Sequence, residues 1–169
     1  NDGACAVVVS SAERAKDLRR QPAYIMGAAQ AFGPECPLMF ETTLFRSVIT
    51  ESQAKYVAPH VFGMAGVGPE DISVAEIYDC FTITALILLE DYGFCKKGEG
   101  GAFVEDGRIE LGGALPLNTH GGHLGEAYIH GFNHIVEGVR QIRGESTAQV
   151  KGAELVFVAG GIPSPSSAL

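Results

Sequence analysis

The chain has 169 residues, of which 46% are apolar and 19% are charged, and its formal net charge is −8. This length predicts one domain with a sizeable core, and the acidic balance without a long Lys/Arg run argues against a nucleic-acid or anionic-membrane binder. Glycine supplies 22 residues, which indicates buried elements joined by tight turns rather than disorder.

The spacing of the cysteines and the first residues of the chain predict the compartment of the protein and whether the sequence is a piece of a longer one. Cys5, Cys36, Cys80 and Cys95 form neither a CxxC metal knuckle nor a dense disulfide framework, so we expect reduced thiols in a cytoplasmic protein. No uncharged stretch reaches the roughly 20 apolar residues of a membrane-spanning helix. The chain begins at Asn1 without a signal segment, and we expect it to be a piece of a longer protein.

The first part of the chain predicts two strands and two helices. Ala4–Val9 is a run of small and β-branched residues, typical of a strand buried on both faces, and Ser10–Ser11 would cap a helix after it. Tyr24–Phe32 predicts a second strand. Ser52–Met64 carries apolar residues at helical spacing, and the glycines that follow would end that helix.

A short strand and a buried helix come next. Ser73–Tyr78 predicts the strand, and Phe81–Leu89 is apolar nearly all round, as expected for a helix in the core. Tyr78–Cys80 therefore occupy the turn at the carboxyl end of the strand.

The glycine-rich segment Gly98–Asn118 is expected to leave the core. Within it, Asp106–Gly107 predicts the turn of a β-hairpin between strands at 102–105 and 108–111.

A last helix and strand complete the pattern. Tyr128–Ile142 predicts an amphipathic helix, and Leu155–Ala159 predicts a buried strand that turns at Gly160–Gly161. The apolar residues expected to face the core are Ile129, Phe132, Ile135, Val136, Val139 and Ile142. Alternation of strands and helices predicts a three-layer α/β fold, in which sites collect beyond the carboxyl ends of strands.

Three loops lie at such strand ends or at helix starts, and they are the candidate site. They are Glu76–Phe81, Asn118–Gly131 and Val158–Gly161. Paired glycines in the second and third loops would let a ligand approach the backbone closely.

Histidines concentrate in the second loop and just beyond it. His120, His123, His130 and His134 lie within fifteen residues, a density that raises the question of a metal site. The cluster has no carboxylate or thiol at ligand spacing and no HExxH or CxxC pattern, so we expect no metal. For His134 on the predicted helix, and for His60, we expect a packed or surface role.

The familiar patterns for other chemistries are missing from the sequence. It contains no G-x-S-x-G nucleophile turn and no GxGxxG or GxxxxGK[ST] phosphate loop. Cys80 lies on a candidate loop, where a buried structural thiol is its expected role.

At these loops the chain resembles the carboxyl-terminal half of the thiolase superfamily. Asn1-Asp2-Gly3-Ala4 looks like the N-D-G-A strand at the boundary between the two thiolase halves, and Glu76–Phe81 resembles the N-E-A-F loop. Asn118–Gly131 is similar to the N-x-x-G-G…G-H-P segment, and Val158–Gly161 falls where the C-x-G loop should be. The resemblance implies that residues 1–169 form one thiolase-like C-terminal domain, a mixed five-stranded sheet covered by helices.

The chain departs from the thiolase pattern at the reacting positions. Tyr78 stands where the N-E-A-F asparagine is expected, and Tyr128 stands where the G-H-P histidine is expected. No cysteine occurs between Cys95 and Leu169, so the second catalytic cysteine is missing too. Claisen chemistry needs a thiolate, a base and an acid, and two of these roles have lost their usual residues.

A tyrosine pair is what the thiolase-like aldolases of steroid side-chain degradation show at these loops. Glu99–Phe103 and Glu126–Gly131 also look like that branch, which is related to the lipid-transfer and sterol-carrier-protein-X group. The resemblance implies retro-aldol cleavage of a β-hydroxyacyl-CoA into a ketone and a shorter acyl-CoA, with Tyr78 and Tyr128 as acid and base.

Supporting residues follow from the needs of that chemistry. A tyrosine acting as a base near pH 7 needs a lowered pKa, for which His120, His123 or His130 would supply a donor or cation. Backbone N–H groups at Gly121–Gly122 or Gly160–Gly161 would hold the enolate oxygen. For Asn118, capping the loop and binding substrate remain equal alternatives.

Two other functions stay open at this point. One is a 3-ketoacyl-CoA thiolase or acetyl-CoA acetyltransferase whose nucleophilic cysteine lies in the other half, and one is a non-catalytic lipid or acyl-CoA binding module. The resemblance implies coenzyme A as part of the substrate and no separate cofactor. The implied partners are an acyl-CoA thioester, the N-terminal thiolase half, a second copy in a homodimer, and a zinc-ribbon/OB-fold protein.

Overall fold

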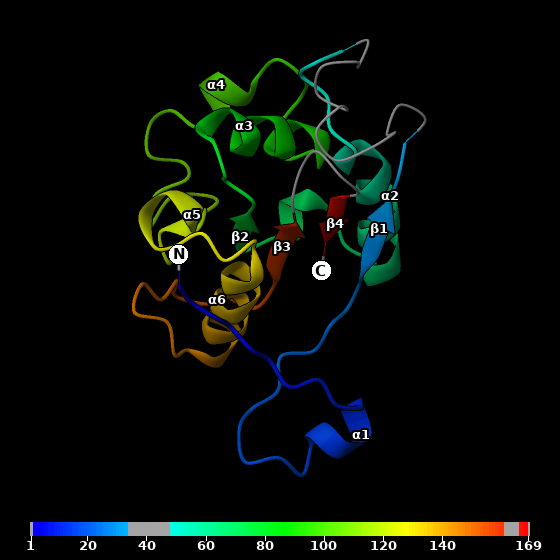
Figure 1. Ribbon diagram of the computed structural model, residues 1–169, viewed down its shortest axis with the longest axis vertical. Coiled ribbons are helices and arrows are strands. Elements are labelled where there is room, and N and C mark those ends of the chain that lie inside the picture. The colour runs from blue at the N-terminus through cyan, green and yellow to red at the C-terminus, as the bar shows by residue number, and fades with distance from the viewer. Residues whose placement is uncertain (1, 34–47, 161–165, 169) are drawn as a thin grey trace.

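A computed structural model describes residues 2–33, 48–160 and 166–168 of the chain. Their elements are α1 (Ala12–Ala15), β1 (Ala29–Ala31), α2 (Ala54–Ala65), the 3₁₀ turn η1 (Pro69–Asp71), β2 (Val74–Ile77), α3 (Thr82–Asp91), α4 (Gly100–Phe103), α5 (Gly122–Gly125), α6 (Phe132–Arg143), β3 (Val156–Gly160) and β4 (Ser166–Ala168). Figure 1 shows the strands at the centre of the fold, with helices on both sides of them.

The described strands form one mixed sheet with the order β1-β4-β3-β2. β2 and β3 are parallel, whereas β4 is antiparallel to both β3 and β1. Residue 117 extends the sheet beyond β2 through an isolated parallel bridge between Leu117 and Ala75. The α/β class and the mixed sheet predicted from the sequence are confirmed, with four strands rather than five among the described residues.

Alternating side chains on β3 contact helices on opposite faces of the sheet. The ring of Phe157 packs against Phe62 of α2 and Tyr92 beside α3, with centroids 5.2 and 4.8 Å away. On the other face, a Cβ at Gly138 of α6 would lie 3.2 Å from Val158. Helices thus cover both faces of the sheet, and this is the three-layer arrangement expected of the sequence.

Helix α6 turns the polar side of its amphipathic pattern inward. The sequence predicted that its apolar residues face the core, but Phe132 is 39% exposed and Ile135 is only half-buried. The residues of α6 that are buried are Asn133, His134, Glu137, Gly138 and Gln141. An amphipathic pattern tells which residues share a face, and the polar residue on the facing strand, Glu76, decides which face is buried.

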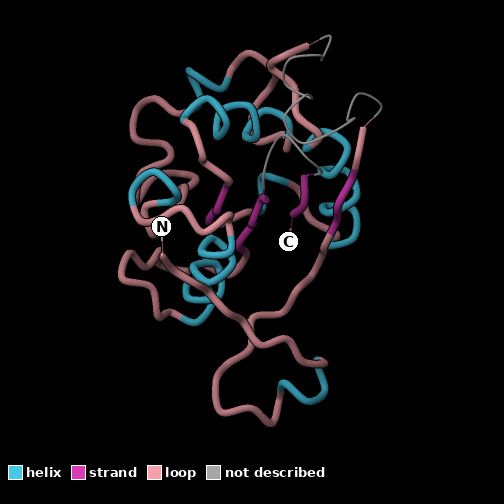
Figure 2. Tube along the Cα trace, viewed as in Figure 1, coloured by secondary structure: helices cyan, strands magenta, loops and turns pink. Residues whose placement is uncertain are grey.

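The predicted strand Ala4–Val9 is wrong for this structure. Residues 2–10 have no strand partner among the described residues, and Val8 and Val9 are 93% and 75% exposed. A strand needs a neighbour to accept its backbone hydrogen bonds, and this segment runs past α6 and away from the sheet. Apart from α1, residues 2–28 are loop (Figure 2).

The predicted β-hairpin is correct only at its turn. Asp106 and Gly107 adopt positive φ angles of 57° and 73°, as a tight hairpin turn requires. The residues on either side do not pair, because α4 occupies 100–103 and the carbonyl of Arg108 accepts from the N–H of Leu115 instead.

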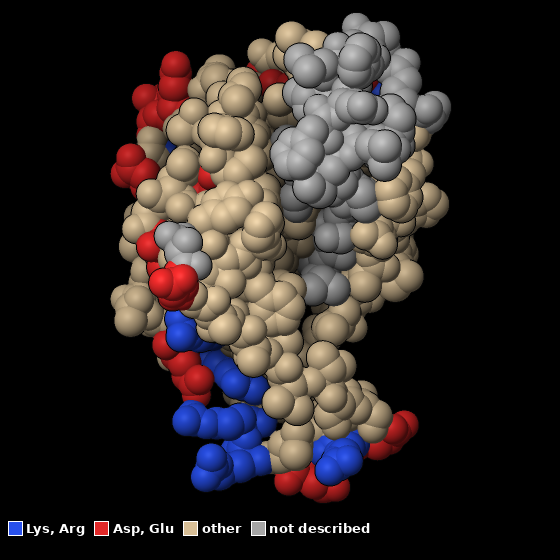
Figure 3. Space-filling model, in the orientation of Figure 1, with Lys and Arg blue, Asp and Glu red and all other residues tan. Residues whose placement is uncertain are grey.

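Charge is unevenly spread over the surface. Figure 3 shows Lys and Arg gathered at the narrow end of the molecule that carries α1. The exposed residues around α1 include Arg14, Lys16 and Arg19, and Arg20 forms an ion pair of 2.5 Å with Glu145 after α6. This contact ties the N-terminal segment to the domain.

Within 2–33, 48–160 and 166–168, no helix has both the length and the apolar content that a membrane span requires.

We predict that Phe157→Ala lowers the free energy of unfolding by about 3–5 kcal/mol, because it empties the centre of an aromatic cluster. Phe157 is 2% exposed, whereas Leu111 is 59% exposed, so Leu111→Ala is the matched control and should stay within about 0.5 kcal/mol. Urea denaturation of the full-length protein measures both, and equal effects would contradict the assignment of the core.

Candidate active site

Two tyrosine hydroxyl groups meet beyond the carboxyl end of β2. Tyr78 directly follows β2, and its N–H donates to the carbonyl of Ala159 at 3.2 Å, so the strand register fixes its position. The Tyr78 hydroxyl lies 2.6 Å from the hydroxyl of Tyr128, within hydrogen-bond distance. Tyr78 is 5% exposed and Tyr128 is 40% exposed, so Tyr128 is the member of the pair nearer to solvent.

The backbone between α5 and α6 carries Tyr128 to its partner. The sequence predicted a helix from Tyr128 onward, but α6 begins at Phe132, because His130 and Gly131 have positive φ angles of 50° and 81°. A Cβ on residue 131 would lie 3.2 Å from the Tyr78 ring, so glycine lets the start of α6 come close to that ring.

His130 contacts the tyrosine pair from the exposed side. Its Nδ1 lies 3.5 Å from the Tyr78 hydroxyl, and its ring centroid lies 4.9 Å from that of Tyr128. A positive φ at a residue other than glycine is a strained conformation that persists where the surroundings impose it. Of the three histidines expected to support the tyrosines, His130 is the one within hydrogen-bond reach of a hydroxyl.

His123 packs against both tyrosine rings. Its ring centroid lies 4.6 Å from the centroid of Tyr78 and 4.6 Å from that of Tyr128. Burial and the adjacent His134 lower the pKa of His123, so its imidazole is neutral near pH 7. His123 therefore packs against the two tyrosine rings as a neutral imidazole.

Asp79 holds α5 against the end of β2. Its Oδ1 accepts the backbone N–H of His123 at 2.8 Å. A Cβ on Gly122 would lie 2.1 Å from Asp79 Oδ2, and Gly122 has a φ of 63°, so only glycine allows this approach. Burial raises the pKa of Asp79, but the contacts with His134 and His123 outweigh it, and the net shift is downward.

Asn118 fastens the second loop to the last residue of β2. Its Oδ1 accepts the N–H of Ile77 at 2.7 Å, and its Nδ2 donates to the carbonyl of Ile77 at 2.8 Å. Both ends of the amide are thereby used on backbone. Between the two alternatives left open by the sequence, this geometry favours the capping role over substrate binding.

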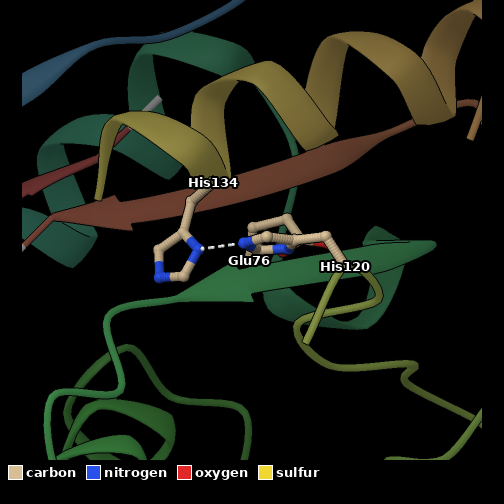
Figure 4. Close-up of side chains that lie close together, drawn as sticks. All are labelled: Glu76, His120 and His134. Carbon is tan, nitrogen blue, oxygen red and sulfur yellow. Dashed lines mark hydrogen bonds and ion pairs between the residues drawn. The ribbon is translucent and has the colours of Figure 1, made fainter. Parts of the chain in front are cut away.

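A buried chain of charged and imidazole groups lies behind the tyrosines. His120 Nδ1 lies 2.9 Å from Glu76 Oε2, and His120 Nε2 lies 3.0 Å from His134 Nδ1 (Figure 4). The side chains of all three residues are 5% exposed or less. Burial lowers the pKa of His120, but the close carboxylate of Glu76 raises it more, so the net shift is upward.

A second carboxylate extends this chain toward the far end of α6. Glu137 Oε1 lies 2.8 Å from the hydroxyl of Thr119 and accepts from Ser146 at 2.6 Å and from Gln141 at 3.1 Å. The Thr119 hydroxyl also lies 2.8 Å from Glu76 Oε1. Two buried carboxylates thus share one hydroxyl group.

The predicted enolate-binding backbone groups are only partly available. The N–H of Gly121 donates to the carbonyl of Asn118 at 2.8 Å and cannot also bind a substrate oxygen. Gly160 lies in β3 opposite Ser167 of β4. Gly161 lies outside the described residues.

Two groups of side chains bring possible metal ligands within 4.8 Å of one another. They are Glu76, His120 and His134, and Asp79, His123 and His134. In the first group the nitrogens of His120 and His134 point at each other at 3.0 Å, the geometry of a hydrogen bond rather than of two lone pairs converging on an ion. Cys5, Cys80 and Cys95 are free thiols and belong to neither group.

Sequence reasoning missed the carboxylates and the second imidazole of this network. Asp79 lies on the turn predicted at Tyr78–Cys80 and is 5% exposed, and His134, for which a packed or surface role was expected, is packed and fully buried. One signal was present, because Glu76 is the only charged residue in the predicted strand Ser73–Tyr78. A charge in a strand buried on both faces requires partners from the layer that covers it.

Comparison with known proteins defines the family. The family described as "Thiolase C-terminal domain-like" matches residues 41–167. The chain belongs to this family, and the relationship expected from the sequence is confirmed.

Two named proteins and one solved structure are similar to the chain over nearly all of its length. The chain is 47% identical, over 99% of its length, to a 17-hydroxy-3-oxo-4-pregnene-20-carboxyl-CoA lyase of Mycobacterium tuberculosis. It is 46% identical, over all of its length, to a steroid side-chain-cleaving aldolase of Thermomonospora curvata. The solved Ltp2-ChsH2(DUF35) aldolase resembles it with a TM-score of 0.86 at 44% identity, covering 93% of this chain and 41% of that one. The chain spans 43% of the length of each of the two named relatives.

We predict that Gly122→Ala destabilises the full-length protein by about 1–3 kcal/mol, because the new Cβ strains the backbone and collides with Asp79. Gly125 offers a matched control in the same short helix, since a Cβ there meets nothing within 4 Å. Thermal unfolding compares the two variants. If Gly125→Ala destabilises as much as Gly122→Ala, the Asp79 contact is not the cause.

Proposed function

We propose that the full-length protein cleaves a β-hydroxyacyl-CoA by a retro-aldol reaction at Tyr78 and Tyr128. The observation that carries this proposal is the 2.6 Å contact between the two hydroxyl groups, at the loops where a thiolase would hold its asparagine and histidine. Two phenols in contact can pass protons between them, and proton transfer is what a retro-aldol reaction requires.

The different exposure of the two tyrosines supports a division of roles between them. Burial and the hydrogen bond to Tyr128 raise the pKa of Tyr78 above its usual range, so Tyr78 keeps its proton and is the acid. Tyr128 is more exposed and is the base, as its phenolate. His130, beside both rings, is the residue that a substrate would contact next.

The two tyrosines together take up and return every proton that the proposed reaction moves. Tyr128 takes the proton of the β-hydroxyl group, the bond between the α and β carbons breaks, and the products are a ketone and a thioester enolate. Tyr78 gives its proton to the enolate carbon. The proton on Tyr128 then crosses the 2.6 Å contact to Tyr78, which restores both groups. The reaction consumes neither water nor free coenzyme A.

The substrate class draws support from the relatives. One is named as a lyase of a 17-hydroxy steroid carboxyl-CoA and one as a steroid side-chain-cleaving aldolase. We propose a steroid acyl-CoA with a tertiary β-hydroxyl group as substrate, and coenzyme A as part of that substrate without a further cofactor.

The assembly is part of the same proposal. The chain is less than half the length of its named relatives, and the apolar side of α6 is half-exposed, so we propose that an N-terminal thiolase half covers it. The structural relative carries a two-component name, which supports a separate partner protein, and we propose that this partner has a zinc ribbon and an OB-fold. We propose a cytoplasmic homodimer of the full-length chain with that partner.

A two-substrate comparison tests the reaction class. The full-length protein with its partner is given a β-hydroxyacyl-CoA with a tertiary hydroxyl group, and separately a 3-ketoacyl-CoA with free coenzyme A. Mass spectrometry should find ketone and shorter acyl-CoA from the first substrate without added coenzyme A. Cleavage of the second substrate alone would instead indicate a thiolase with a cysteine in the other half.

We predict that Tyr78→Phe and Tyr128→Phe each lower kcat by roughly 10²–10⁴-fold, the usual contribution of a positioned acid or base. Each variant keeps the ring and loses the proton carrier, so acyl-CoA affinity should stay within a few-fold of the original. Tyr24→Phe is the matched control, because Tyr24 is 58% exposed and lies outside the site. Near-normal turnover in either site variant would refute the assignment.

A further inference from the structure

The chain of four side chains behind the tyrosines runs from one carboxylate to another through two imidazoles. Glu76 Oε2 faces His120 Nδ1 at 2.9 Å, His120 Nε2 faces His134 Nδ1 at 3.0 Å, and His134 Nε2 faces Asp79 Oδ1 at 3.5 Å. Figure 4 shows the first three side chains in one cluster, with Glu76 on β2 and His134 on α6.

Each of these three contacts needs a proton on an imidazole nitrogen. An imidazole nitrogen without its proton presents a lone pair, and a lone pair that faces a buried carboxylate oxygen is repelled. With Glu76 and Asp79 both ionised, His120 Nδ1 and His134 Nε2 therefore both carry protons, and the hydrogen bond between the two rings needs a third. Two neutral imidazoles carry only two protons, so this geometry requires one extra proton on the pair.

The two carboxylate contacts are held by charge. Glu76 Oε2, His120 Nδ1 and His134 Nε2 are buried, and among the described residues they form no aligned hydrogen bond. Neutral groups at these distances would leave buried polar atoms uncompensated. An imidazolium between two carboxylates compensates them, because Coulomb attraction does not depend on alignment.

The groups that face the imidazole pair from other elements favour the same charge. Glu126, which follows α5, lies 3.7 Å from His120 Nε2, and Glu137 of α6 also acts on His120 through its charge. His123 is the opposing group, since it faces His134 with ring centroids 4.7 Å apart. The lowered pKa of His123 keeps its ring neutral. The carboxylates are therefore the groups whose charge acts on the imidazole pair.

This charged pair lies directly behind the tyrosines. The ring of His134 lies 6.5 Å from that of Tyr78, with an edge-on arrangement. His123 lies between the pair and Tyr128, with its centroid 4.7 Å from His134 and 4.6 Å from Tyr128. Negative charge that forms on the tyrosine oxygens or on an enolate therefore lies near a buried cation.

We propose that His120 and His134 together hold one buried imidazolium, clamped between Glu76 and Asp79, which stabilises the negative charge that develops at the tyrosine pair. The two histidines act through space and through His123, so they are positioning residues and do not touch the substrate. The catalytic part of this inference rests on the proposed function, whereas the charge state of the pair does not.

The sign of the pH dependence follows from the contact with Glu76. A histidine whose folded pKa is raised above 6.5 keeps its charge at low pH and loses it as the pH rises through the folded pKa. The contribution of the imidazolium should therefore be complete below pH 6.5 and disappear on the alkaline side. Removing the Glu76 charge should move that loss to lower pH.

The charge state is measured first, without any substrate. Nitrogen-15 NMR of histidine-labelled full-length protein should show three protonated ring nitrogens on this pair at pH 6.5, assigned by their loss in His120→Gln and His134→Gln. Two neutral rings at that pH would overturn the proposal. One equivalent of metal bound to the purified protein, lost in both variants, would overturn it as well.

The catalytic role is measured by the pH profile of kcat. Glu76→Gln keeps the shape of the side chain and removes its charge, and it should shift the alkaline limb to lower pH and lower kcat on the order of tenfold with little change in KM. His60→Gln, on the exposed side of α2, is the control and should change nothing. An unmoved limb in Glu76→Gln would refute the role, even if overall activity falls.

The two measurements separate this inference from the proposed function. Three protonated nitrogens in a protein that fails to cleave β-hydroxyacyl-CoA would leave the imidazolium in place and refute the reaction. Cleavage by a protein with two neutral imidazoles would support the reaction and refute the imidazolium. If Glu76→Gln does not fold, the spectra of the unmodified protein still decide the charge state.

Discussion

The burial of the Glu76 carboxylate in the middle of β2 is the constraint on which the site depends. A fully buried charge costs several kcal/mol unless it is compensated, and here the compensation comes from Thr119 and His120 on the second loop. Helix α6 then turns its polar face inward, and Glu137 reaches the same Thr119 hydroxyl group. One buried carboxylate thus explains both the loop conformation and the inverted orientation of the helix.

The same network places the tyrosine pair. β2 carries Glu76 inward and ends one residue before Tyr78, while the loop that supplies His120 continues through α5 to Tyr128. Because the loop is anchored at Glu76 and again at Asp79, the position of Tyr128 is fixed at two points behind it. Buried and charged side chains therefore fix the position of the tyrosine pair.

Sequence reasoning named two tyrosines that the structure brings together, and it missed much of the network behind them, for physical reasons. The position of Tyr78 follows from local patterns, since a strand, a turn and a helix meet there. The approach of Tyr128 depends on the left-handed conformation of His130, which no local pattern predicts for a histidine. The inward face of α6 depends on Glu76, a residue far away in the sequence. The strand predicted at Ala4–Val9 required a neighbouring strand that the described residues do not provide.

The central claim is that the tyrosine pair carries the protons of a carbon–carbon cleavage. Its most direct test is a single turnover of a β-hydroxyacyl-CoA in D₂O without free coenzyme A, by the full-length protein with its partner, followed by mass spectrometry of the shorter acyl-CoA. The account predicts ketone together with acyl-CoA that has gained one deuterium at the α carbon, and loss of both products in Tyr78→Phe. Cleavage that continues with the same deuterium content in Tyr78→Phe would contradict it.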